Sequence, residues 1–223
     1  MKHKLLSIIL SVSLIATLCN TNMVFASSEI MLSDDVALLS LEQTPNLQKM
    51  VLSENGNITN VTIQEDSHTV TTTLEKAETG REDFFIVDKD NNTLYSSITG
   101  KTISLDSVND TEISLFSSAP DTGSLKISYK TMYDALGAVS EIITVASLIL
   151  TIMSSQLPYP PLTTAALLVD TFSYALTMIM NKIPSKETKK GGQVKYEKVT
   201  YTKHQAGQVF HTYKYKVTDL GAY

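Results

Sequence analysis

After its first 26 residues, this sequence contains three histidines, whose side chains can bind a metal ion or transfer a proton. His204 and His211 fall on two segments that we predict to pair as strands, diagonal to each other on one face, which is a possible two-histidine metal site. No third ligand accompanies them, so packing of an amphipathic strand explains both residues better. His68 stands apart from the other two.

Carboxylates offer a second opportunity for chemistry at Asp83, Asp88 and Asp90. Their spacing is similar to that of a calcium loop, but the glycine and the distal glutamate of such a loop are missing, so we predict a hairpin turn instead. No hydrolase, metalloprotease, dinucleotide-binding or phosphate-loop motif is present. We therefore expect no enzymatic activity, no cofactor and no metal ion.

The N-terminus has the pattern of a secretory signal peptide, which we assign to residues 1–26. Two lysines precede an apolar run over residues 5–18, and Val24 and Ala26 supply the small residues that a signal peptidase recognises. We predict cleavage between Ala26 and Ser27 and secretion of the mature chain. An uncleaved anchor is the alternative, but the apolar run is shorter than the ~20 residues that a spanning helix needs. Lipidation at Cys19 is rejected because Leu18 precedes it.

Charge divides the mature chain into two regions. Residues 27–120 carry 16 acidic and five basic residues, whereas residues 121–223 carry seven acidic and 11 basic residues. Such asymmetry indicates different partners for the two regions, or that each region is the partner of the other. The breaker-rich stretch from Ser114 to Ser124 is the expected linker. We interpret the first region as a leader that shields the second.

Most of the acidic region is predicted to be β-structure. A weak helix is expected over Asp34 to Ser53, interrupted by Pro45. After it, β-branched residues and turn signals alternate. The expected strands, which form a small antiparallel meander, are Asn57 to Gln64, Thr69 to Leu74, Phe84 to Val87, Thr93 to Ile98 and Thr102 to Leu105.

The basic region is predicted to contain an apolar αα-hairpin over about residues 124–181. Its two runs, Ser124 to Ser154 and Leu162 to Met180, are separated by a stretch with three prolines that no helix can continue through. A β-hairpin follows over about residues 193–218. The complete prediction is an α+β fold: a signal peptide, a small antiparallel β-rich acidic region, the αα-hairpin and the C-terminal β-hairpin.

The αα-hairpin admits three interpretations: conditional insertion into a membrane, a permanent membrane hairpin, or the core of a soluble domain. Helices that are apolar all round need burial on every side, which a region of about 100 residues can hardly supply. Glu141 and Asp170 argue against a permanent span. Conditional insertion is favoured, and the residues expected to enter the membrane are Leu148, Ile149, Leu150, Leu167, Leu168 and Val169.

Nine lysines lie between Lys182 and Lys216, directly after the apolar runs. Lysines beside a membrane contribute about 1 kcal/mol each near an anionic surface, although an ordinary solvated face explains them equally well. The residues expected at lipid headgroups are Lys182, Lys186, Lys189, Lys190, Lys214 and Lys216. Nucleic acid is not an expected partner, because strand alternation separates Tyr213 and Tyr215 from the neighbouring lysines.

The order of these segments resembles that of the large, geobacillin-like secreted antibacterial proteins of Gram-positive bacteria. The resemblance covers most of the chain: the signal peptide, the acidic Thr-rich region, the apolar stretch Ala135 to Met180 and the Lys- and Tyr-rich tail Val194 to Val217. It includes no catalytic signature. It implies a bacteriocin-like activity on the anionic membranes of related bacteria. The alternatives are a non-toxic envelope protein held by the same hairpin and a soluble secreted binding module.

Overall fold

Strands dominate the part of the chain that the structure describes. The computed structural model describes residues 23–24, 29–44, 46–105, 122–138, 141–156, 165–180, 183–184, 189–205 and 208–223. The larger sheet is formed by β1 (Met23–Val24), β2 (Ile30–Met31), β3 (Val36–Thr44), β4 (Leu47–Glu54), β5 (Asn57–Glu65), β6 (Thr69–Lys76), β7 (Glu82–Asp88), β8 (Thr93–Ser96) and β9 (Lys101–Ser104). The smaller sheet is formed by β10 (Thr122–Ser128), β11 (Gly191–Gln205) and β12 (Gln208–Ala222), and the helices are α2 (Tyr129–Leu136), α3 (Ile142–Gln156) and α4 (Ala165–Met180).

The larger sheet is an antiparallel meander in which β3 to β9 pair in sequence order. Alternation gives it one apolar face. In β5, for example, Val61 and Ile63 are buried, whereas Asn60 and Thr62 point to the other face. The β4–β5 turn places Asn55 and Gly56 at positive φ, which is the conformation of a two-residue hairpin turn that matches the strand twist.

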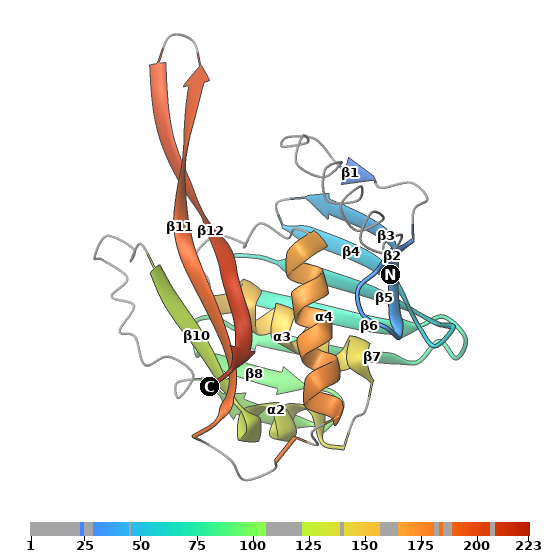
Figure 1. The fold of residues 1–223 in the computed structure, drawn as a ribbon. Helices are drawn as coiled ribbons and strands as arrows, with labels where there is room; N and C mark the ends of the chain where they lie inside the picture. Colours follow the sequence, from blue (N-terminus) through green and yellow to red (C-terminus); the bar gives the residue numbers. More distant parts are fainter. Residues whose placement is uncertain are drawn as a thin grey trace, which may run out of the picture.

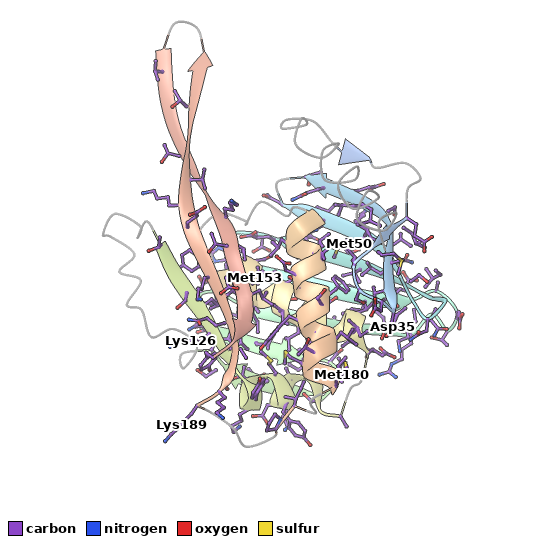
Figure 2. All side chains as sticks on the ribbon, viewed as in Figure 1. Asp35, Met50, Lys126, Met153, Met180 and Lys189 are labelled. Atoms are coloured by element: carbon purple, nitrogen blue, oxygen red, sulfur yellow. The ribbon has the colours of Figure 1, made fainter. Side chains whose placement is uncertain are left out.

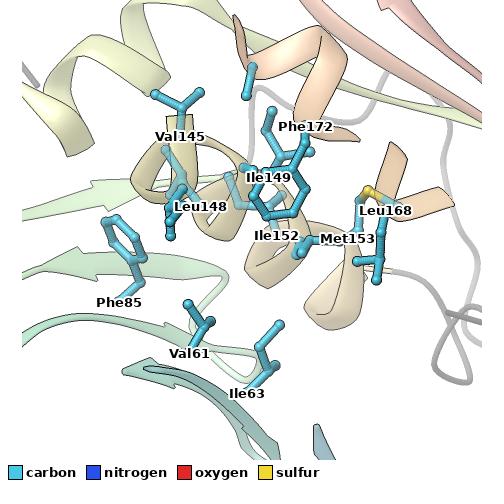
Figure 3. Packing of buried hydrophobic residues seen from close by; sticks show 14 of the residues in the cluster. Val61, Ile63, Phe85, Val145, Leu148, Ile149, Ile152, Met153, Leu168 and Phe172 are labelled. Carbon is cyan, nitrogen blue, oxygen red and sulfur yellow. The ribbon is translucent and has the colours of Figure 1, made fainter. Parts of the chain in front are cut away.

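Helix α3 lies on the apolar face of this sheet and is covered on its other side by α4 (Figure 1). Figure 3 shows Phe85 and Val61 from the sheet approaching Leu148 of α3, with Phe172 of α4 beyond it. One cluster of buried side chains runs through sheet, α3 and α4. It therefore takes residues from both the acidic and the basic region.

Polar contacts also fasten α3 to the sheet. The Thr151 hydroxyl hydrogen-bonds the Thr72 hydroxyl of β6 over 2.7 Å, and both residues are fully buried. At the C-terminal end of α3, the Gln156 amide donates to the Asn92 side-chain oxygen over 2.8 Å. These bonds satisfy polar groups that would be costly to bury alone.

The expected fold class is wrong. The chain is mostly β rather than a small β region beside an apolar αα-hairpin, because the meander grows into a nine-stranded sheet. The two apolar runs contain α3 and α4, of which α3 is only the later part of the first run, and they do not make a separate hairpin unit. The sheet of the acidic region buries one side of α3 and α4 covers the other, a possibility that the sequence argument on a region of 100 residues did not include.

Two segments expected to be helical contain strands. Asp34 to Ser53 forms most of β3 and β4, which pair from Val36 opposite Glu54 to Thr44 opposite Leu47, so this segment is a β-hairpin rather than a broken helix. Ser124 to Ser128 belongs to β10, and α2 begins only after it. The Ser128 side chain caps α2 by accepting the Thr131 backbone N–H over 3.1 Å.

Several local predictions are confirmed. The strands expected between Asn57 and Leu105 are present as β5 to β9. The Asp88 carboxylate organises the β7–β8 turn as expected, accepting the backbone N–H groups of Asp90 and Asn91. The C-terminal β-hairpin is also present, with Gln205 opposite Gln208 and residues 206–207 between them.

Candidate functional site

The most prominent feature of the surface is the ribbon, which we define as the β11–β12 hairpin over residues 191–222. The third strand of its sheet, β10, pairs only with Gly191 to Glu197 of β11. From Lys198 onward the ribbon continues as two strands and stands away from the body of the molecule (Figure 1). We call residues 198–205 and 208–215 the distal ribbon, and residues 191–197 and 216–222 the proximal ribbon. Two paired strands alone are marginally stable in water, so the distal ribbon is a natural place for a partner to contribute contacts.

Close backbone packing anchors the proximal ribbon to the body. A Cβ on Gly191 would lie 2.0 Å from the Ile127 carbonyl oxygen of β10, so only glycine fits there. The Tyr196 ring, which is buried, lies over Gly123 in the same way. At the C-terminal end, the Tyr223 backbone N–H donates to the Gly191 carbonyl over 3.0 Å.

Lysines of the proximal ribbon form ion pairs within the ribbon and still reach solvent. Lys195 pairs with Asp219 over 2.8 Å, and Lys216 pairs with Glu197 over 3.7 Å. The two lysine side chains are 53% and 60% exposed. The hydrogen bond from Lys195 holds the pKa of the Asp219 carboxyl below its usual value. Such exposed pairs are weak, so an anionic partner can compete for the lysines.

The lysines expected at lipid headgroups fall into two groups. Lys189 and Lys190 are exposed and directly precede β11, and Figure 2 shows Lys189 at the base of the ribbon, pointing away from the body. Lys216 is exposed on β12. Lys214 lies on β12 opposite Val199, but its side chain is outside the description, as are Lys182 and Lys186 altogether.

The residues expected to enter a membrane lie in or against the core instead. Leu148, Ile149 and Leu150 of α3 are no more than 4% exposed. On α4, Leu167 and Leu168 are buried, and Val169 is half-buried against the same cluster. No helix among the described residues is both long and apolar enough to cross a membrane. The predicted cleavage site at Ala26 and Ser27 lies outside the described residues.

A small charged cleft lies where the β6–β7 turn meets the start of α3. It measures about 170 Å³, and its lining residues are Lys76, Arg81, Asp83, Ile98, Ala138, Glu141 and Thr144. Its charges satisfy one another: Lys76 pairs with Glu141 over 2.5 Å, and Arg81 pairs with Asp83 over 3.1 Å. The Thr144 hydroxyl donates to Glu141 over 3.1 Å. The Lys76–Glu141 pair fastens the start of α3 to the sheet.

The residues considered for metal chemistry are not gathered in one place. The ribbon register places His204 opposite Val209 and His211 opposite Thr202, which is the expected diagonal, although neither side chain is described. His68 bonds Asp90 across two neighbouring turns, 2.8 Å apart. In the described part of the chain, no three side chains of the metal-binding types converge.

Sequence reasoning missed the projection of the ribbon, because nothing in the sequence showed that β11 and β12 extend beyond their pairing with β10. A scan against models of protein families, a search among curated proteins and a search among solved structures each find no match to this chain. The function is therefore argued from the site itself.

Proposed function

We propose that this chain is a secreted, non-enzymatic antibacterial protein that binds the anionic membrane of target bacteria through its ribbon. The observation that carries the proposal is a group of exposed lysines at the base of the ribbon: Lys189 and Lys190, directly before β11, and Lys195 and Lys216 on the proximal ribbon. The order of segments shared with geobacillin-like antibacterial proteins is consistent with it. Secretion rests on the signal-peptide pattern of residues 1–26.

The ribbon, rather than α3 and α4, makes the first contact in this proposal. Exposing α3 would remove twelve buried residues from the core, from Ile142 to Met153. Each apolar side chain among them stabilises the folded body by roughly 1.5–3 kcal/mol, so membrane binding has to begin on a surface that is already available. The ribbon presents such a surface without unfolding.

Vesicle co-sedimentation tests the proposal on the full mature chain. Vesicles that contain phosphatidylglycerol should bind the protein, vesicles of phosphatidylcholine should not, and added salt should weaken binding. The double variant K189S/K190S should bind roughly 30-fold more weakly, because each lysine contributes about 1 kcal/mol near an anionic surface. The matched control K49S/K101S removes two lysines from the larger sheet and should change binding little.

Killing is tested separately, by dye release from the same vesicles and by growth inhibition of Gram-positive bacteria. Binding without either effect would favour the envelope protein, and fractionation would then find the mature chain with the membranes of the producing cell. Equal binding to both kinds of vesicle, or equal loss in both double variants, would overturn the role of the lysines at the base of the ribbon.

A second candidate, a secreted binding module without membrane activity, is favoured by the burial of α3 and α4. It predicts a mature chain that remains in the medium and binds neither kind of vesicle.

A further inference from the structure

The larger sheet has a second face, which we call the outer face, on the side opposite α3. Its side chains form a continuous row across six strands, because each residue is the register partner of the next. The row consists of Leu47, Gln64, Thr71, Ile86, Tyr95 and Thr102. A neighbouring row consists of Lys49, Thr62, Thr73 and Phe84.

The described helices cover only the opposite face of this sheet. The side chains that meet α3 alternate with those of the outer face, as the buried Thr72 does with Thr71 and Thr73. The outer-face residues are half-buried or exposed, as expected for side chains that no described helix covers. The outer face thus has the accessibility of a binding surface.

Two aromatic rings lie on the neighbouring strands β7 and β8 of the outer face. The centroids of Phe84 and Tyr95 are 5.9 Å apart, with their planes tilted by 38°. Threonines of β5, β6 and β9 surround them: Thr62, Thr71, Thr73 and Thr102. Gln64 adds an amide. These residues therefore combine apolar ring surface with hydroxyl and amide groups that both donate and accept hydrogen bonds, and none of them is charged; the next residues of the same face along β6 and β7 are Glu75 and Glu82.

We propose that the outer face of the sheet binds a neutral glycan chain. A sugar ring presents an apolar C–H surface above and below and hydroxyl groups around its edge. Aromatic rings bind the first feature and threonine or glutamine side chains bind the second. A row that spans six strands, at about 4.8 Å per strand, has the length to hold several sugar residues in line.

Other partners fit the outer face less well. Nucleic acid and anionic lipid need a cluster of cations, and Lys49 is the one cation in the two rows. A second copy of the chain would need a more continuous apolar patch than one interrupted by threonines at nearly every second position. The chemistry of the glycan partner is independent of the ribbon and of membrane binding.

Titration calorimetry of the mature protein with two soluble hexasaccharides, one of β-1,4-linked N-acetylglucosamine and one of β-1,4-linked glucose, tests this proposal. At least one of them should bind, with little dependence on salt. Y95A should weaken binding about tenfold or more, and Y95F, which keeps the ring, should stay close to the parent protein. Y133A, which removes a half-buried tyrosine from α2, is the matched control and should bind normally.

A charge introduced beside the two rings gives a second test of glycan binding, because Thr73 is the register partner of Phe84. T73K should abolish binding, whereas T200K, which adds the same charge to an exposed ribbon position, should not. Thermal unfolding of each variant shows whether the sheet remains intact. If neither hexasaccharide binds, or if Y95A and Y133A lose binding equally, the proposal is overturned. It is equally overturned if sedimentation shows a dimer that only the outer-face variants dissociate.

Discussion

The Glu54 carboxylate at the end of β4 accepts the backbone N–H of Ile142 at the start of α3 over 2.9 Å. Its second oxygen accepts the next N–H, that of Ile143, over 3.1 Å. A carboxylate from a residue 88 positions earlier in the chain thus caps the most deeply buried helix. The bond satisfies two of the N–H groups that every helix leaves unpaired at its start, and the negative charge lies at the positive end of the helix dipole.

Removing this cap should destabilise the whole protein. E54A leaves the two N–H groups without their acceptor, and we expect the free energy of unfolding to fall by about 1–2 kcal/mol. E54Q keeps one side-chain oxygen and should lose less. Urea unfolding followed by circular dichroism measures both. The control E75A, at an exposed position of β6, should change stability by no more than about 0.5 kcal/mol, and an equal loss in E54A and E75A would rule out the capping role.

Mild acid should not loosen the body. Burial raises the pKa of Glu54 above 4.5 and that of Asp170 above 3.8, so the folded state takes up these protons at a higher pH than the unfolded chain does. Stability therefore rises as the pH falls toward the raised pKa values. Hydrogen bonds lower the pKa of the Asp66 and Asp88 carboxyl groups. Their contribution to the free energy of unfolding is therefore present above pH 3.8 and is lost only below that pH.

The urea midpoint at about pH 5 should consequently be at least as high as at pH 7, with a decline only below about pH 3.8. E54Q should flatten the rise between neutral pH and the raised pKa of Glu54. A midpoint that falls steadily from pH 7 to pH 5 would contradict this reasoning and would make acid a plausible trigger for release of α3.

Two glycines of the proximal ribbon should respond in opposite ways to the same substitution. G191A forces a methyl group to within 2.0 Å of the Ile127 carbonyl oxygen, and separation of β10 from β11 should cost about 1–3 kcal/mol or more. G221A meets no atom within 4 Å and should be neutral or slightly stabilising. Urea unfolding distinguishes them, and equal effects would show that β10 does not pack on Gly191 as closely as described.

The ribbon was predictable because its signal is local. Alternation from Val209 to Val217 and a two-residue turn fix the register, and Thr202 indeed lies opposite His211. The placement of α3 was not predictable in this way, because it depends on partners such as Glu54 and Thr72 that are distant in sequence. An apolar run has the same pattern whether a membrane or a sheet buries it. The strands β3 and β4 were missed because their segment was taken for a helix interrupted at Pro45, whereas its two halves pair with each other as strands.

Charge placed in the two apolar runs separates a structural role from a membrane role. Leu148 of α3 is fully buried, and L148K would place an unpaired cation in the core, so we expect an unfolded chain and a reduced secreted yield. L168K on α4 should behave similarly. L148A removes only apolar contacts and should cost about 2–5 kcal/mol. The matched control M180K changes a residue that is 75% exposed at the end of α4 and should leave the fold intact.

Circular dichroism and urea unfolding of the purified variants measure these effects, and vesicle leakage is then measured for each variant that folds. If L148K folds but no longer releases dye, membrane insertion of the apolar runs is again the better interpretation. If L148K and L168K fail to fold while M180K folds and causes normal leakage, α3 and α4 belong to the core. The membrane contact is then left to the ribbon.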